Sequence, residues 1–151
     1  MRLAILLLAA VAAAPAEFLE LRIVFEGTDC LSCAESLEPR LARVRGVEKV
    51  ELDLETSTIR LALAVGNKVR LGPLEARITQ DGTKIASIEA VCRGAVVGGD
   101  GGPSLQPDGL TEALPLAGAE LPPAGAHGEA AGRILDGRFE LEKWRPDPKE
   151  R

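Results

Sequence analysis

Cys30 and Cys33, two thiols three positions apart, are the residues of this chain whose chemistry is easiest to anticipate. They lie in the stretch Gly27-Thr28-Asp29-Cys30-Leu31-Ser32-Cys33-Ala34, after an apolar run at 19–25 and before a segment with helical periodicity. The thiolate form of cysteine binds metals and attacks disulfides. Free N–H groups and the helix dipole at a helix start favour that negative charge. The pair therefore predicts either a soft-metal site or a dithiol redox pair.

The number of ligands within reach limits which metal ion the pair can hold. Two thiolates suffice for Cu(I) or Hg(II) in two-coordinate geometry, whereas Zn(II) takes about four ligands. Asp29, next to Cys30, offers a carboxylate oxygen to such an ion. Cys30, Cys33 and Asp29 are therefore the candidate metal ligands.

The elements that must position these ligands follow from hydrophobic periodicity. The pattern predicts strands at 19–25, 47–54, 59–65 and 84–92, and helices at 32–45 and about 71–80. We expect Leu54 and Val65 to face inward from the hairpin, and Pro39 to kink the first helix without ending it. This order matches the ferredoxin-like βαββαβ sandwich, an α+β fold with two helices on one face of a four-stranded antiparallel sheet.

With motif and element order in place, the chain resembles the heavy-metal-associated domain family. This family includes periplasmic mercuric-ion-binding proteins, copper chaperones and the N-terminal domains of metal-pumping ATPases. Residues 27–33 resemble its G-M-T-C-x-x-C motif, and Gly46-Val47 followed by Val50-Glu51-Leu52-Asp53 resembles its G-V-x-x-V-x-V-D turn and strand. The resemblance covers roughly residues 19–92 and implies the ferredoxin-like fold.

The resemblance also implies a function. It implies one heavy-metal ion bound by Cys30 and Cys33, which is carried or buffered and then passed on by ligand exchange. The implied partners are a membrane metal transporter or another metal-binding domain, and we expect a monomer that forms at most a transient metal-bridged dimer. No catalytic constellation is visible in the sequence, so we do not expect an enzyme.

Two positions depart from the family motif. Thr28 stands where the family usually has Met, and Asp29 stands where Thr is common. An acidic residue at that place resembles the variant found in zinc, cadmium and lead pumps, so Cu(I), Hg(II), Zn(II) and Cd(II) all stay open. In the family, a Lys or an aromatic residue near the second loop lies beside the metal, and Lys84 is the matching cation here.

Other interpretations of the same residues stay open. The pair can cycle as a dithiol and disulfide, form a plain disulfide, or be vestigial, although neither Trp nor Pro accompanies it as in thioredoxin-like motifs. The chain can also be an envelope interaction module whose metal fold is only a scaffold. We expect Cys92 to be a buried structural cysteine and His127 to be a solvated loop residue.

The N-terminal segment and the net charge indicate the compartment and the classes of partner. Met1-Arg2, an apolar run and small residues around Ala14-Pro15-Ala16 predict a signal peptide at 1–16 cut after Ala16, hence a secreted, periplasmic protein. The 151-residue chain has a formal charge of −5, and without Arg2 the charge becomes −6. Such an acidic product is a poor ligand for nucleic acid or anionic membranes.

The second half of the chain differs in composition from the first. We expect a heavy-metal-associated domain at 17–93, followed at 94–151 by either a Gly/Pro-rich extension or a small β module. Asp136-Gly137 lies between two strand-like runs and predicts a hairpin. Together with the apolar clusters near residues 91–97 and 114–116, this hairpin is loosely similar to part of an oligonucleotide-fold barrel.

Overall fold

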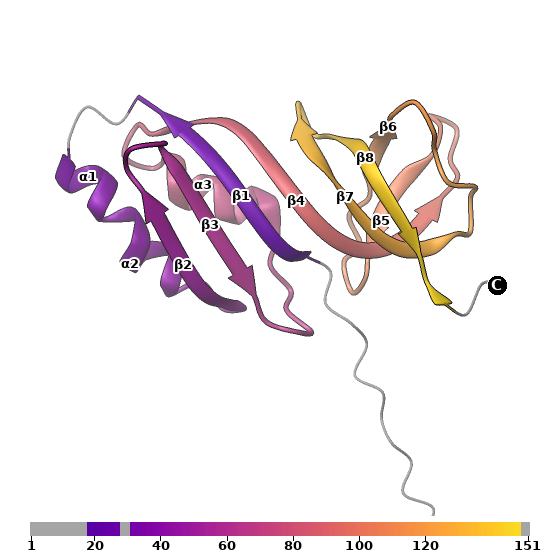
Figure 1. The fold of residues 1–151 in the computed structure, drawn as a ribbon, viewed down its shortest axis with the longest axis horizontal. Coiled ribbons are helices and arrows are strands. Elements are labelled where there is room, and N and C mark those ends of the chain that lie inside the picture. Colours follow the sequence, from indigo (N-terminus) through magenta and orange to yellow (C-terminus); the bar gives the residue numbers. More distant parts are fainter. Residues whose placement is uncertain (1–17, 28–30, 149–151) are drawn as a thin grey trace, which may run out of the picture.

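One long strand joins the two parts of the molecule (Figure 1). The computed structural model describes residues 18–27 and 31–148. Its elements are β1 (Phe18–Glu26), α1 (Leu31–Glu35), α2 (Leu37–Ala42), β2 (Val47–Asp53), β3 (Thr58–Leu63), α3 (Leu71–Thr79), β4 (Lys84–Val97), β5 (Ser104–Pro107), β6 (Leu114–Ala117), β7 (His127–Leu135) and β8 (Arg138–Pro146). The boundary predicted between residues 93 and 94 falls inside β4, which contributes to both parts.

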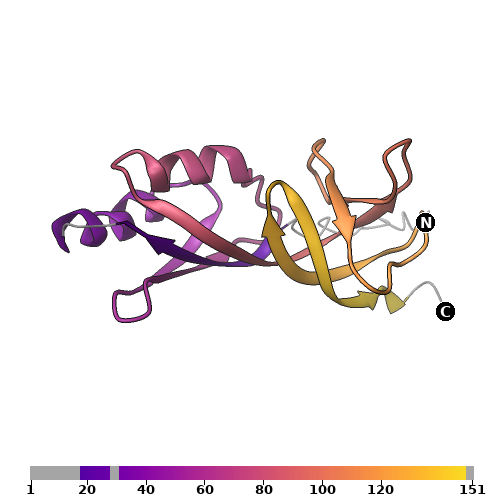
Figure 2. The same cartoon turned by 90° about the horizontal axis from the view of Figure 1, so that it is seen from above.

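The first part has the predicted ferredoxin-like topology. Its strands run in the order β2-β3-β1-β4, all neighbours antiparallel, and the helices α2 and α3 pack on one face (Figure 2). The predicted helical stripes are the residues that the helices bury, since Leu37 and Leu41 of α2 and Leu74 and Ile78 of α3 have almost no exposed surface. Burial of such side chains is the main force that holds a helix to a sheet.

The prediction of a four-stranded sheet was wrong in its extent, because the sheet has eight strands. From about Ile88 onward β4 also pairs with β7, and its last residues pair with β5. The order β4-β5-β6-β8-β7 then returns to β4, with β6 and β8 parallel and the other pairs antiparallel. A closed five-strand arrangement of this kind is the architecture of the oligonucleotide-fold barrel.

One turn and one close approach show how the sequence permits this closure. Asp136 and Gly137 have φ of 50° and 72°, as a tight two-residue hairpin turn requires, so the predicted hairpin is confirmed. A Cβ at position 132 would lie only 2.1 Å from the carbonyl oxygen of Glu140. Glycine is therefore the residue that lets β7 and β8 approach closely enough to curve around the barrel.

Three local predictions need correction. Leu54 is 40% exposed and Val65 is 74% exposed, because β2 and β3 end at Asp53 and Leu63 and both residues fall in turns. The first helix is not one helix with a kink, since it is divided at Ser36 and ends at Ala42. Proline has no N–H to donate to the carbonyl four residues earlier, and the division lies within one turn of Pro39.

The predicted signal segment at 1–16 lies outside the described residues. Across 18–27 and 31–148, no helix is long and apolar enough to cross a membrane.

Candidate metal centre

The loop that carries the thiol pair connects the end of β1 to α1 (Figure 1). Cys33 lies in α1 and is half-buried, while Asp29 and Cys30 lie outside the described residues. The loop starts at Gly27, whose φ of 76° is a left-handed conformation that glycine adopts without strain. The structure thus describes both flanks of the predicted site and one of its three ligands.

Lys84 lies beside Gly27, the residue at which this loop starts. Its partner across the β1–β4 ladder is Glu26, the residue before Gly27. A Cβ on Gly27 would lie 3.8 Å from Cγ of Lys84 and 3.9 Å from the carbonyl oxygen of Gly82. The aliphatic stem of Lys84 therefore packs along the start of the loop at Gly27.

Hydrogen bonds hold the other flank of the loop. The hydroxyl of Ser36 donates to the carbonyl oxygen of Cys33 at 2.7 Å, and it accepts from Nη2 of Arg40 at 2.7 Å. Arg40 also forms an ion pair with Asp81 at 2.9 Å. Asp81 accepts from the backbone N–H and the hydroxyl of Thr83 at 3.2 and 2.8 Å.

Burial and the polar contacts of Asp81 act on its ionisation in opposite directions. Burial by itself raises the pKa of this carboxyl group. The hydrogen bonds from Thr83 and Arg40 and the charge of Arg40 outweigh it, so the pKa of Asp81 lies below its ordinary value. Asp81 is therefore ionised at neutral pH and holds Arg40 as a true ion pair.

Sequence reasoning missed this network for an identifiable reason. The four-residue spacing of Ser36 and Arg40 places them on one helix face, and Asp81 with Thr83 has the pattern of an Asx turn, so both halves left a local signal. The contact between Arg40 and Asp81 joins positions 41 apart. Only the packing of α2 against α3 brings them together.

Cys92 is separate from the loop and buried, as predicted. It has no exposed surface and lies in β4 between Phe18 of β1 and Ala130 of β7. Burial, reinforced by the charges of Asp108 and Glu129, raises the pKa of its thiol to about 12. A thiol that stays protonated is a poor metal ligand, so Cys92 acts as a small apolar core residue.

The prediction that His127 is a solvated loop residue was wrong. It begins β7 and is half-buried, with Nδ1 2.7 Å from an oxygen of Asp147 and Nε2 2.7 Å from an oxygen of Asp108. Arg93 forms an ion pair with Asp147. Because closure of the barrel brings these four segments together, nothing local in the sequence could have revealed the cluster.

The histidine cluster is not a second metal centre. Within the part of the chain that the structure describes, no group of three or more His, Cys, Asp or Glu side chains has the arrangement of a metal site. Both ring nitrogens of His127 are already engaged by carboxylates, which leaves neither one for a metal ion. The cluster is a structural ion-pair network.

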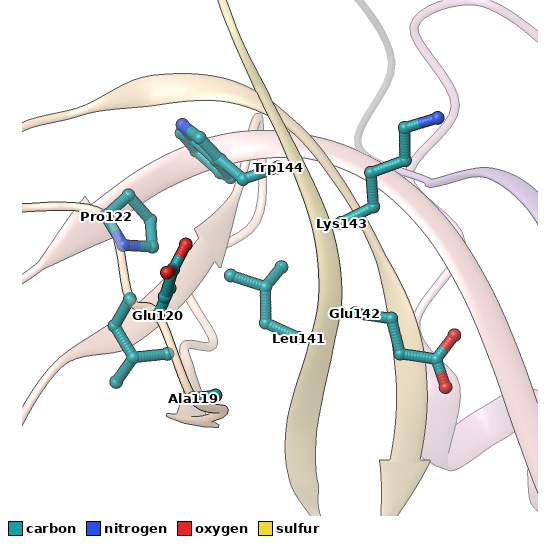
Figure 3. A pocket seen from close by; sticks show the side chains of 8 residues that line it. Ala119, Glu120, Pro122, Leu141, Glu142, Lys143 and Trp144 are labelled. Carbon is teal, nitrogen blue, oxygen red and sulfur yellow. The ribbon is translucent and has the colours of Figure 1, made fainter.

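A pocket of about 530 Å³ lies on the barrel, between β8 and the segment that precedes β7. Figure 3 shows Leu141 and Trp144 pointing toward Pro122 and Glu120, while Lys143 points away. No Cys or His lines it. The pocket therefore adds no thiol or imidazole ligand to the candidate site.

No family model and no curated protein matches the chain. Among similar solved structures, the CopZ metallochaperone is 21% identical, with 44% of this chain and 98% of that chain covered and a TM-score of 0.40. The N-terminal domain of a potential copper-translocating P-type ATPase from Bacillus subtilis in the Cu(I)-loaded state is 20% identical. The match covers 45% of this chain and 84% of that chain, with a TM-score of 0.40. A copper binding domain from HMA7, a P-type ATPase, is 23% identical, with 44% and 92% covered and a TM-score of 0.38.

Proposed function

We propose that this chain binds one soft or borderline heavy-metal ion through Cys30 and Cys33 and carries or buffers it. The observation that supports the proposal is the position of Cys33 in α1, the first helix after β1 in a ferredoxin-like part, with the stem of Lys84 against Gly27 at the start of the intervening loop. A thiol in the first turn of a helix is favoured as a thiolate. Asp29 joins the two thiolates when the ion is Zn(II) or Cd(II).

The charge balance supports a role for Lys84. Two thiolates around Cu(I) carry a net charge of −1, and so do two thiolates and one carboxylate around Zn(II) or Cd(II). A lysine ammonium group beside the loop offsets that charge without occupying a coordination position. Lys84 therefore stabilises the loaded state, and its exposed, flexible head leaves the site accessible.

The proposed mechanism is ligand exchange, not catalysis. An incoming pair of thiolates displaces one bound sulfur at a time, so that the ion is always shared by two or three ligands. The partners we propose are another metal-binding domain or a membrane metal transporter in the same compartment, the periplasm. Nucleic acid is disfavoured as a partner of the barrel, because residues 94–148 contain nine carboxylates against four Lys and Arg side chains.

Native mass spectrometry tests the proposal. The protein, purified anaerobically, is mixed with Cu(I), Hg(II), Zn(II) and Cd(II) together under reducing conditions. We expect one ion per chain in the wild type and in Cys92→Ser, and none in Cys30→Ser/Cys33→Ser. Stoichiometric binding by the double variant would overturn the proposal, since the ion would then be held elsewhere.

The same experiment addresses the choice of metal. If Asp29 is a ligand, Asp29→Asn lowers the share of Zn(II) and Cd(II) in the competition and leaves Cu(I) and Hg(II) unchanged. An unchanged distribution would remove Asp29 from the ligand set while leaving the thiolate pair in place. Catalytic reduction of a disulfide substrate by the metal-free protein would instead favour the redox interpretation.

A further inference from the structure

The helix that carries Cys33 is a short, separate piece. It ends at Glu35, and α2 begins at Leu37, with Ser36 at the junction. Pro39 cannot donate an N–H to the carbonyl oxygen of Glu35, so one bond that would join the two pieces is missing. The hydroxyl of Ser36 donates to the carbonyl oxygen of Cys33 at 2.7 Å. Backbone bonds from Ser36 N–H to the Ser32 carbonyl and from Arg40 N–H to the Ser36 carbonyl remain across the junction. The side-chain bond from Ser36 to Cys33 adds to them and holds Cys33 relative to α2.

Arg40 makes the contacts that connect this junction to its neighbours. Nη2 donates to the Ser36 hydroxyl at 2.7 Å and to a carboxylate oxygen of Asp81 at 2.9 Å. Nη1 donates to the carbonyl oxygen of Arg77, near the end of α3, at 2.9 Å. Only 17% of the Arg40 side chain and 20% of the Asp81 side chain is exposed. One guanidinium group thus binds the helix junction, α3 and the loop that follows α3.

The same network reaches the opposite flank of the metal loop. The second oxygen of Asp81 accepts from the backbone N–H and the hydroxyl of Thr83, which is buried. The next residue is Lys84, whose stem packs against Gly27. Gly27 precedes the loop and Cys33 follows it, so a continuous set of contacts centred on Arg40 links the two ends of the loop.

We propose that Arg40 is a positioning residue for the metal loop. It holds the Cys33 helix in register with the loop at 80–84, and thereby strengthens metal binding and slows metal release. This inference rests on the proposed function. Charge-assisted hydrogen bonds from a planar guanidinium group are stronger and more directional than neutral ones, and a lysine lacks the rigid fork that reaches three separate acceptors.

The chain supplies a matched control for the loss of charge. Arg43 lies one turn along the chain from Arg40, and both line the same pocket of about 310 Å³. Among the ion pairs and side-chain hydrogen bonds of the described residues, none involves the Arg43 side chain. Arg43→Ala removes one positive charge from the same surface without touching the network.

The first measurement uses metal-free protein, so that it does not depend on the proposed function. In a Cys30→Ser background, Cys33 is alkylated with iodoacetamide under native conditions, while the buried Cys92 does not react. We expect Arg40→Ala and Ser36→Ala to raise the alkylation rate about three- to tenfold, Arg40→Lys to raise it less, and Arg43→Ala to leave it unchanged. Equal rates in Arg40→Ala and Arg43→Ala would overturn the inference.

The second measurement uses Cd(II) and the intact thiol pair. Chelator competition and stopped-flow release should show about three- to tenfold weaker binding and faster release in Arg40→Ala, but not in Arg43→Ala. If Arg40→Ala melts below the assay temperature, Ser36→Ala and Arg40→Lys decide the question. Failure of the wild type to bind Cd(II) or any other of the four ions would refute the proposed function alone. Normal binding in every Arg40 and Ser36 variant would refute the positioning role alone.

Discussion

The ion-pair network around His127 predicts how the stability of the protein depends on pH. His127 is the only histidine of the chain, and its ring joins Asp108, after β5, to Asp147, after β8. Partial burial by itself lowers the pKa of His127. The hydrogen bonds to Asp108 and Asp147 and the charges of these carboxylates outweigh burial, so the pKa of His127 is raised above its ordinary value.

Because the pKa of His127 is raised in the folded protein, the stability that it contributes should decrease as the pH rises. A pKa that is higher in the folded than in the unfolded protein gives stability that is fully present below the unfolded value, about 6.5 for histidine. That stability is lost as the pH rises through the folded pKa. The free energy of unfolding should therefore fall as the pH rises above about 6.5 and passes through the folded pKa of His127, and His127 should account for the fall.

Protonation of Asp147 should weaken the network at low pH. Burial by itself raises the pKa of Asp147, but the hydrogen bonds and charges of His127 and Arg93 lower it below its ordinary value. Its contribution is present above the unfolded pKa of about 3.9 and is lost as the pH falls through the folded value. The network is therefore most stabilising between about pH 4 and pH 6.5.

The size of the effect follows from the contacts. A hydrogen bond to a charged group contributes about 1.5–3 kcal/mol when buried. The His127 side chain is 32% exposed, so solvent screening reduces this value. We expect about 1–2 kcal/mol for the whole network, or about 3–6 °C in melting temperature for a chain of this size.

Urea unfolding of wild type and His127→Gln checks the prediction. Both proteins are measured from about pH 5.5 to about pH 8.5 with a reductant and a metal chelator present. We expect wild type to be more stable at the acidic end and the two curves to converge at the alkaline end. Thiol groups and the chain terminus titrate alike in both proteins and cancel in the difference. A difference between the proteins that does not change with pH would refute the reasoning.

Three further predictions concern tightly packed positions in the two parts of the molecule. Gly132→Ala should cost about 2–4 kcal/mol in urea unfolding, because its Cβ would clash with the backbone of β8, whereas Gly101→Ala, with open space around it, should change stability by less than about 0.5 kcal/mol. Asn67→Ala should cost about 2–3 kcal/mol, because the buried Asn67 amide donates to two backbone carbonyls and accepts from a backbone N–H; near-wild-type stability would contradict this. Cys92 should react with a thiol reagent only in denaturant, and fast labelling in native buffer would contradict its burial and its pKa of about 12.

Local pattern determined most of the first half of this protein. The neighbours of Cys33 were enough to predict that it lies in a helix that follows the first strand. The stripes that include Leu37, Leu41, Leu74 and Ile78 predicted which helix faces are buried. The turn at Asp136-Gly137 likewise depends on two adjacent residues that tolerate positive φ. These features were predictable because their causes act over a few residues.

Tertiary structure decided the rest, because the decisive contacts join distant positions. The sequence predicted that β4 would end at Cys92, but pairing with β5 and β7 extends it to Val97. His127 looked solvated until barrel closure placed two carboxylates beside it. Arg40 gains its carboxylate partner only because packing against α3 brings Asp81, 41 positions away, beside it. The sequence alone thus pointed to the thiol pair, whereas only packing across the sheet and between the helices revealed the contacts of Arg40 with Ser36 and Asp81.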